Sequence, residues 1–308
     1  MRILILHPNA SNAYSWQLGT FREEVGRQHD AVYYGAGYQN RGEFNVPAIV
    51  EQLGPFDCIL LGDYKYCGQY YGLDEIKNSI KVVSVTDYFP RNFAPVNNFI
   101  NLHKPHLVLF KNTLTLNSFE KFKTTGAIDS SIKGQILPFS VDTKRFRDYF
   151  LVRDIDISAV FALVSWAYPK RAPLQQELRE MEREFQIVMN DGGRLSPRDY
   201  IQLLARTKLF VSVNGQYNCM TMKYLECLAS GVLFLTDKPV DFERMGFKGG
   251  QHMVLYKDFD QMERQVRHYL GNKEERLRIA EAGKRFVRAN HSDEFRVKEF
   301  TTIVEGML

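Results

Sequence analysis

The chain has 308 residues, of which 44% are hydrophobic and 13% aromatic, enough for about two domains with buried cores. This composition excludes a disordered chain and a miniprotein held together by disulfides. The 40 Lys and Arg residues exceed the 36 Asp and Glu residues by a formal charge of +4, which is spread over both halves and gives no support to binding of duplex nucleic acid.

Several features bear on location. The four cysteines form no CxxC pair, which is typical of a reducing compartment. The apolar run over residues 1–6 stops at His7-Pro8, which indicates a first strand and not a signal peptide. No uncharged apolar stretch approaches the roughly 18 residues that span a bilayer. We therefore expect a soluble cytoplasmic protein, and a peripheral contact at the inner face of a membrane stays open.

The first half of the chain alternates short apolar runs with polar or amphipathic stretches. Between the first two runs, Phe21 and Val25 fall at helical spacing with Leu18, which predicts a helix over residues 15–27. Such short, continuously apolar runs are typical of buried parallel strands joined by crossover helices. The predicted strands are residues 3–6, 31–34, 58–61, 82–85, 107–110 and 136–139.

A second series of elements follows the charged stretch at residues 142–146. Ser196 and Pro197 predict the capped start of a helix that runs to about Ala205. The other predicted helices are residues 173–185, with proline near its start, 222–229, segments of 258–291 broken near Gly271 and at His291, and 293–308. The predicted strands are residues 157–164, 187–189, 209–213, 232–236 and 253–256.

This order of elements predicts an α/β protein with two Rossmann-like, doubly wound domains that face each other across a cleft. The predicted domains are residues 1–142 and 143–290, and a helix over residues 291–308 is left free to cross back to the first domain. In such sheets ligands bind outside the carboxyl ends of the strands. We therefore look for function in the loops that follow strands.

The loop after the first strand, which begins His7-Pro8-Asn9, lacks the glycines of a dinucleotide site, and the chain has no P-loop. A better candidate follows the strand that ends near Val164. There Lys170 and Arg171 directly precede a predicted helix, so that two cations and a helix amino terminus can bind one anionic group. The alternative, that both are solvated loop charges, has about equal weight.

The segment over residues 209–236 combines a strand, a polar loop, a short helix and another strand. Asn214 and Gly215 lie in the loop, and Glu226 lies on the helix among apolar residues. A carboxylate in this position needs a partner or a ligand to offset its desolvation. An ion pair with Lys223 is the structural alternative to a ligand.

Residues 223–232 read KYLECLASGV, and this stretch resembles the nucleotide-sugar motif of the group 1 GT-B glycosyltransferases, including their CgeB-like and spore-maturation-like members. A second match lies at the end of the predicted first domain. Residues 137–146 read LPFSVDTKRF and are similar to the Pro-x-Gly-Val-Asp signature of that family, with Ser140 in place of the glycine.

The resemblance implies that the second domain binds a nucleotide-sugar donor and the first domain an acceptor. Lys170 and Arg171 would then stabilise the diphosphate as the leaving group develops charge, and Glu226 would accept hydrogen bonds from the ribose. Many relatives carry an acidic residue where this chain has Asn218, which can bind sugar hydroxyls but supplies no negative charge. The implied donor-binding residues are Ser165, Asn214, Gly215, Asn218, Lys223 and Glu226.

On the acceptor side, Asp87 directly follows the fourth predicted strand and is a candidate catalytic or acceptor-orienting group, with a turn cap as the alternative. Four tyrosines follow the third strand and suit either stacking on a sugar or lipid-linked acceptor, or packing, which we favour. They are Tyr64, Tyr66, Tyr70 and Tyr71. His103 and His106 are separated by a proline that disfavours joint metal binding, and no metal is expected.

The sequence and the resemblance together predict a hexosyltransferase that moves a sugar from a nucleoside-diphosphate donor, with UDP-sugar favoured, to a glycan, lipid-linked or other hydroxyl acceptor. Retention of anomeric configuration and independence from metals and cofactors belong to this prediction. A nucleotide-sugar epimerase of the same architecture and a non-catalytic nucleotide-sugar-binding protein are the alternatives. A nucleic-acid acceptor stays open, although no basic stripe supports it.

Overall fold

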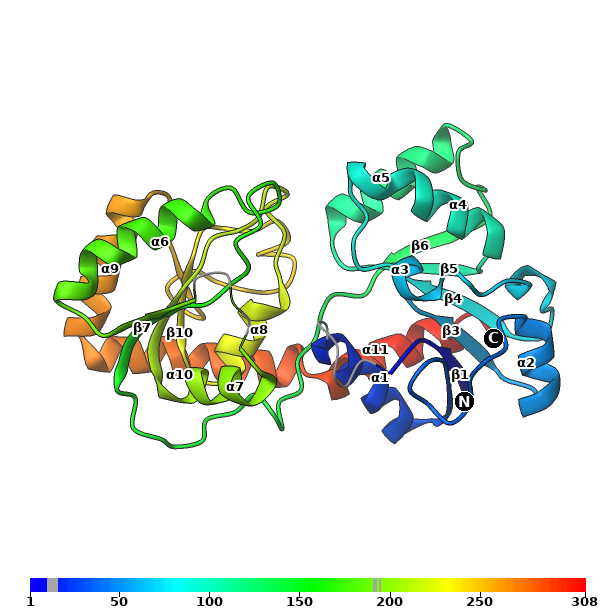
Figure 1. Ribbon diagram of the computed structural model, residues 1–308, viewed down its shortest axis with the longest axis horizontal. Coiled ribbons are helices and arrows are strands. Elements are labelled where there is room, and N and C mark those ends of the chain that lie inside the picture. Colours follow the sequence, from blue (N-terminus) through cyan, green and yellow to red (C-terminus); the bar gives the residue numbers. More distant parts are fainter. Residues whose placement is uncertain (10–15, 191–192, 194) are drawn as a thin grey trace. The chain divides into compact units, whose positions relative to one another are not determined.

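The computed structural model describes residues 1–9, 16–190, 193 and 195–308 (Figure 1). Ser15, where the first helix is predicted to begin, lies outside these residues. The chain forms two compact units. Unit 1 consists of Met1–Phe139 and Asp293–Leu308, and unit 2 of Ser140–Ser292. Unit 2 is therefore an insertion between two parts of unit 1.

Unit 1 is built on a six-stranded sheet in the order β2-β1-β3-β4-β5-β6, and all neighbouring strands are parallel. Its strands are β1 (Arg2–Leu6), β2 (Asp30–Tyr34), β3 (Cys58–Leu61), β4 (Ile80–Ser84), β5 (Leu107–Phe110) and β6 (Lys133–Ile136). Its helices are α1 (Trp16–Gln28), α2 (Val46–Leu53), α3 (Tyr64–Cys67), α4 (Phe93–His103), α5 (Thr113–Thr124) and α11 (Asp293–Glu305), with 3-10 turns η1 (Leu73–Glu75) and η2 (Pro90–Asn92).

The apolar strands of unit 1 are buried on both faces of the sheet. Alternate residues of a strand point to opposite faces, so Leu4 and Leu6 of β1 join the core under α2, α4 and α5, while Ile3 and Ile5 join the core under α1 and α11. Helices α1 and α11 lie side by side (Figure 1). Between them, the aromatic rings of Phe21 and Phe300 meet edge to face at 5.9 Å. The last helix of the chain thus completes the core of unit 1.

Unit 2 is built on a five-stranded parallel sheet in the order β11-β10-β9-β7-β8. Its strands are β7 (Ile155–Ala159), β8 (Ile187–Met189), β9 (Thr207–Val211), β10 (Leu233–Thr236) and β11 (Val254–Leu255). Its helices are α6 (Arg171–Glu180), α7 (Pro197–Arg206), α8 (Met222–Ala229), α9 (Phe259–Gly271) and α10 (Lys273–Asn290), with a 3-10 turn η3 (Met181–Arg183). The central strands pack against α6, α9 and α10 in one continuous core.

The predicted α/β class and several predicted helices are confirmed. Helix α7 begins at Pro197, and the Ser196 hydroxyl caps it by accepting a hydrogen bond from the Asp199 amide at 3.1 Å. Helix α8 has the predicted bounds, and α9 ends at Gly271, where the break is predicted. None of the helices in the described part of the chain has the length and apolar content needed to cross a membrane.

Several predicted bounds differ from those of the structure. The sixth strand occupies Lys133–Ile136 and not residues 136–139, and β7 ends at Ala159 although the apolar run continues to Val164. Helix α6 begins at Arg171, so Pro173 is its third residue. The apolar content of a segment does not show where its strand ends, because a strand ends where backbone pairing with the neighbouring strand stops. Strand β8 pairs with β7 only over residues 157–159.

The two crossings between the units lie at Phe139/Ser140 and Ser292/Asp293, close to the predicted domain bounds at 142 and 290. Within unit 2 the two chain ends are neighbours. Val141 pairs with Ser292 in a parallel bridge, and the Val141 amide donates a hydrogen bond to the carbonyl of His291 at 3.0 Å. Unit 2 therefore leaves and rejoins unit 1 at nearly one point of its own surface.

Candidate functional site

Two loops meet at the carboxyl edge of the sheet in unit 2, where β7, β9 and β10 end. The Gln216 amide in the loop after β9 donates a hydrogen bond to the carbonyl of Ala167 in the loop after β7, at 2.9 Å. A Cβ atom on Gly215 would lie 2.8 Å from the same carbonyl oxygen and 2.9 Å from the ring of Tyr168. Gly215 thus allows the two loops to approach each other.

Asp237, which directly follows β10, is the centre of a polar network at this edge. Its carboxylate accepts hydrogen bonds from the backbone amide of Asn214 at 2.7 Å and from the Lys170 ammonium at 3.4 Å. The Asn214 side chain donates to the Asp237 carbonyl at 2.9 Å. The buried Tyr224 hydroxyl donates to the Asn214 side chain and bonds to the Thr236 hydroxyl. The network fixes Asn214 and holds one cation at the edge.

The two predicted cations differ in their surroundings. The Lys170 side chain is 62% exposed, whereas Arg171, the first residue of α6, is 5% exposed. The Arg171 guanidinium donates to the Ala162 carbonyl at 2.8 Å and lies 3.3 Å from the centre of the Tyr168 ring. Its Nε has no hydrogen-bond partner among the described residues, and burial lowers the pKa of its guanidinium. Arg171 is therefore a buried cation with bonding capacity left.

Glu226 is 2% exposed and belongs to a second buried group. Its Oε2 accepts a hydrogen bond from the Tyr200 hydroxyl at 2.9 Å, and the Lys223 ammonium donates to that hydroxyl at 3.3 Å. Its Oε1 has no partner in the part of the chain that the structure describes. Burial raises the pKa of Glu226 and lowers that of Lys223. These bonds join Glu226 to α7, and none of them joins it to Lys170 or Arg171.

The structure thus distributes the predicted donor residues over two groups linked by α8. Asn214 and Lys170 meet at Asp237, whereas Lys223 and Glu226 meet at Tyr200. Burial lowers the pKa of Lys223, and the positive charge of Arg171 adds to this effect.

The last two predicted donor residues are both exposed in loops. Ser165 lies in the loop after β7. Asn218 has a left-handed backbone with φ of 52°. Its side-chain amide donates to the Lys238 carbonyl at 2.9 Å, and its own carbonyl accepts from the Val240 amide at 2.7 Å. Asn218 therefore ties the loop before α8 to the segment after β10.

In unit 1, Asp87 lies at the carboxyl edge of the sheet and forms an ion pair with Lys65 at 2.6 Å. Both side chains are nearly half exposed. Behind them lies Asp63, which is 6% exposed and accepts hydrogen bonds from the backbone amides of Lys65 at 3.1 Å and Thr86 at 2.8 Å. Burial raises the pKa of Asp63. The ends of β3 and β4 thus present two carboxylates and one cation together.

The four tyrosines after β3 do not act as one surface. Tyr70 is buried, and its ring packs edge to face with Phe44 at 5.7 Å. Tyr66 lies 5.3 Å from the ring of His7, and Tyr71 is 49% exposed. The packing that we favour is therefore confirmed for Tyr70 and for Tyr64, which is partly buried against the core of unit 1.

His103 and His106 have different surroundings. His103 is fully buried, and neither ring nitrogen has a hydrogen-bond partner among the described residues. The His106 ring accepts a hydrogen bond from the Lys81 amide at 3.1 Å. No group of three or more His, Cys, Asp or Glu side chains within residues 1–9, 16–190, 193 and 195–308 is placed to hold a metal ion.

Sequence reasoning missed Asp237, Tyr224 and Tyr200. A signal existed for Asp237, since it directly follows a strand, as the other candidates do. Tyr224 lies within the KYLECLASGV stretch, but nothing local shows that its hydroxyl reaches the ends of β9 and β10. Tyr200 lies on another helix, 26 residues before Glu226, and the sequence carries no sign of that contact.

Comparison with known proteins shows what the chain is similar to. The family described as glycosyl transferase-like matches residues 151–302, which include all of the candidate donor residues. No curated protein sequence matches the chain.

Solved structures extend the likeness to the whole chain. HepE from Anabaena, in complex with UDP and glucose, has a TM-score of 0.68 and 12% identity, and the match covers 99% of each chain. A glycosyltransferase from Rickettsia africae has a TM-score of 0.67 and 13% identity, with 99% of this chain and 98% of that chain covered. Sucrose-phosphate synthase from Thermosynechococcus elongatus has a TM-score of 0.64 and 10% identity, with 100% and 99% covered. The chain thus has the GT-B fold, and the stretch that matches the glycosyl transferase-like family covers most of unit 2 and continues into α11 of unit 1.

Proposed function

We propose that the protein transfers a hexosyl group from a nucleoside-diphosphate sugar, with UDP-sugar favoured, to a hydroxyl group of a glycan or lipid-linked acceptor. One observation carries the proposal. The buried guanidinium of Arg171, with its unpaired Nε, lies beside Lys170 at the amino end of α6, within the domain that matches the glycosyl transferase-like family. Two cations at a helix amino terminus suit a diphosphate.

The other residues have roles that follow from this placement. A diphosphate leaving group gains negative charge in the transition state, and Lys170 and Arg171 would stabilise it there. Lys170 would exchange its weak contact with Asp237 for the phosphate, since that pair is 3.4 Å apart. Glu226 stays the proposed ribose acceptor, because a buried carboxylate oxygen without a partner favours a ligand hydroxyl.

The acceptor would be bound by unit 1. Asp87 is proposed to orient or deprotonate the attacking hydroxyl, with Lys65 held against it and Asp63 behind. Retention of anomeric configuration is part of the proposal. Chemistry without a metal ion is also part of it, because Lys170 and Arg171 supply the positive charge that the leaving group requires. The similarity to HepE, which has structures with UDP and with UDP-glucose, supports a UDP-sugar donor.

Thermal unfolding and calorimetric titration with UDP, GDP and ADP test the donor site. We expect UDP to stabilise the protein, and Arg171→Met to weaken UDP binding by at least about tenfold, because it removes a charged contact to phosphate. Arg264→Met, on exposed α9, is the matched control and should bind UDP as the wild type does. The proposal fails if no nucleotide binds or if Arg171→Met and Arg264→Met behave alike.

Asn218 favours a second candidate, a nucleotide-sugar-binding protein without turnover. This residue stands where many relatives carry an acid, and its amide is engaged with the Lys238 carbonyl. Such a protein would bind UDP with the same dependence on Arg171 but would release no UDP from UDP-sugars in the presence of acceptor extracts. An epimerase would convert the donor sugar with no acceptor present, so product analysis separates all three.

A further inference from the structure

The segment that leads into β7 displays apolar side chains to solvent. Four consecutive residues, Tyr149, Phe150, Leu151 and Val152, are 37%, 89%, 49% and 82% exposed. Contiguous exposed apolar surface on a folded protein marks a contact site with another molecule or with a membrane.

The backbone holds this apolar segment in place. Phe150 has a left-handed backbone with φ of 56°, which a residue with a Cβ adopts only when its surroundings require it. The Asp148 carboxylate accepts a hydrogen bond from the Phe150 amide at 2.9 Å. On the far side, the Arg153 guanidinium donates to the carbonyls of Leu204 at 3.0 Å and Ser230 at 2.7 Å. The display of Phe150 is therefore fixed at both ends of the segment.

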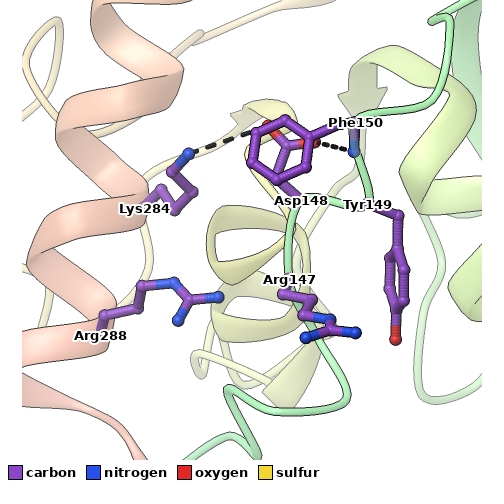
Figure 2. A pocket seen from close by; sticks show the side chains of 6 residues that line it. All are labelled: Arg147, Asp148, Tyr149, Phe150, Lys284 and Arg288. Atoms are coloured by element: carbon purple, nitrogen blue, oxygen red, sulfur yellow. Dashed lines mark hydrogen bonds and ion pairs between the residues drawn. The ribbon is translucent and has the colours of Figure 1, made fainter.

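Cations surround a cavity of about 430 Å³ directly beside the apolar residues. Figure 2 shows Lys284 and Arg288 of α10 on one side and the Arg147–Phe150 segment on the other. The lining holds three cations and the carboxylate of Asp148. The Lys284 ammonium is paired with Glu281 at 2.6 Å and lies 3.8 Å from Asp148, so the positive excess comes from Arg147 and Arg288. Arg288 donates a hydrogen bond to the Thr143 carbonyl at 3.2 Å. The excess of positive charge suits an anionic group.

This surface is separate from the candidate donor site. The segment precedes β7, and Arg153 bonds to the carbonyls of Leu204, before β9, and Ser230, before β10, so the surface lies at the amino edge of the sheet in unit 2. The donor residues lie at the carboxyl edge, about 16 Å away along a five-residue strand. Neither site uses a residue of the other.

We propose that residues 147–152, with Lys284 and Arg288, form a docking surface for anionic phospholipid membranes. Phe150 and Val152 would enter the interfacial layer, Tyr149 would lie at its polar boundary, and lipid phosphates would bind at Arg147 and Arg288. Charge argues for this partner over a second copy of the chain. A two-fold contact of the surface with itself would bring two positively charged patches together, and these would repel each other.

Vesicle flotation with the full chain tests the proposal, using phosphatidylcholine alone and phosphatidylcholine with 30% phosphatidylglycerol. We expect binding to the anionic vesicles only. Phe150→Asn with Val152→Asn should weaken it by about tenfold or more, since asparagine tolerates the left-handed backbone and lacks the apolar group. Arg147→Gln with Arg288→Gln should weaken it by about fivefold for each cation removed.

Two controls keep the outcome decisive. Leu102→Asn changes an apolar residue of α4 that is 53% exposed, and Arg264→Gln changes an exposed cation of α9; both should bind as the wild type does. Unchanged thermal unfolding and UDP binding of the loop variants show that they fold. The proposal is overturned if anionic vesicles bind no protein or if loop and control variants bind alike. It is also overturned if light scattering shows that the wild type is a dimer and that Phe150→Asn converts it to a monomer. It stands or falls independently of the donor site.

Discussion

His103, at the end of α4, is fully buried against the ring of Phe99, with ring centres 4.5 Å apart. Burial lowers the pKa of His103 to about 4 from 6.5, and the nearby Asp74 opposes this shift only in part. The unfolded chain therefore binds a proton between these two pH values that the folded chain does not. Stability from this residue is complete above pH 6.5 and is lost as the pH falls toward 4.

We expect His103→Leu to remove this dependence. Between pH 7.5 and pH 4.5 the variant should lose about 2 to 3 kcal/mol less free energy of unfolding than the wild type, because the buried position no longer takes up a proton. Urea unfolding at the two pH values measures the difference. Phe99→Leu, which alters the same contact without a titratable group, should keep the wild-type dependence. Equal pH dependence in His103→Leu and the wild type would refute the argument.

At the scale of single residues, the sequence placed candidates correctly in loops and helices but could not orient them. Lys170 and Arg171 are adjacent, yet Arg171 turns under the ring of Tyr168 while Lys170 stays exposed. Glu226 bonds to Tyr200, which only the folded chain brings near. Side-chain direction depends on contacts distant in sequence, and a local pattern carries no record of them.

At the scale of elements, Gly283 of α10 allows this helix to pack closely against α8 and against the loop before β11. A Cβ on Gly283 would lie 2.3 Å from the His252 carbonyl oxygen and 2.9 Å from a methyl group of Leu228. Gly271, the last residue of α9, has no atom within 4 Å of such a Cβ. Gly283 and Gly271 therefore allow a controlled comparison, because a Cβ would clash at Gly283 and meets no atom at Gly271.

We expect Gly283→Ala to destabilise the protein by about 2 kcal/mol, since the clash with backbone exceeds the gain in helix propensity. Gly271→Ala should be neutral or stabilise by about 0.5 kcal/mol. Chemical denaturation of both variants checks the contrast. A Gly283→Ala protein as stable as the wild type would mean that α10 shifts freely, contrary to the close packing described.

Most strands were predictable as elements, because they are short apolar runs between polar turns, whereas their ends were not. Strand β6 contains Lys133 and Gln135, so its pairing with β5 is not visible in its composition. Helices α2, α4 and α5 carry weak or short apolar periodicity and escaped notice. The ends of elements depend on partners and caps, and only the caps, such as Ser196, leave a mark in the sequence.

At the scale of the whole molecule, each unit has its own core, and Phe300 of α11 belongs to that of unit 1. We expect two calorimetric transitions. Phe300→Ala should lower the stability of one unit by about 3 to 5 kcal/mol, and Leu235→Ala, in the core of unit 2, should lower that of the other by about 2 to 5 kcal/mol. UDP should raise only the transition that Leu235→Ala lowers. A single transition moved by both variants would contradict this independence.

Because its two ends are adjacent, unit 2 is an insertion that could be removed or exchanged as a whole. Val141 and Ser292 are bridged on one side of the crossings, and on the other the Arg296 guanidinium donates to the carbonyl of Phe139 at 3.4 Å. In each unit, the two chain ends at the crossings are thus already held next to each other by backbone or side-chain bonds. Joining residue 139 directly to residue 293 would give unit 1 as one continuous chain. A foreign domain with adjacent termini would fit at the same position without changing the strand order of the sheet in unit 1.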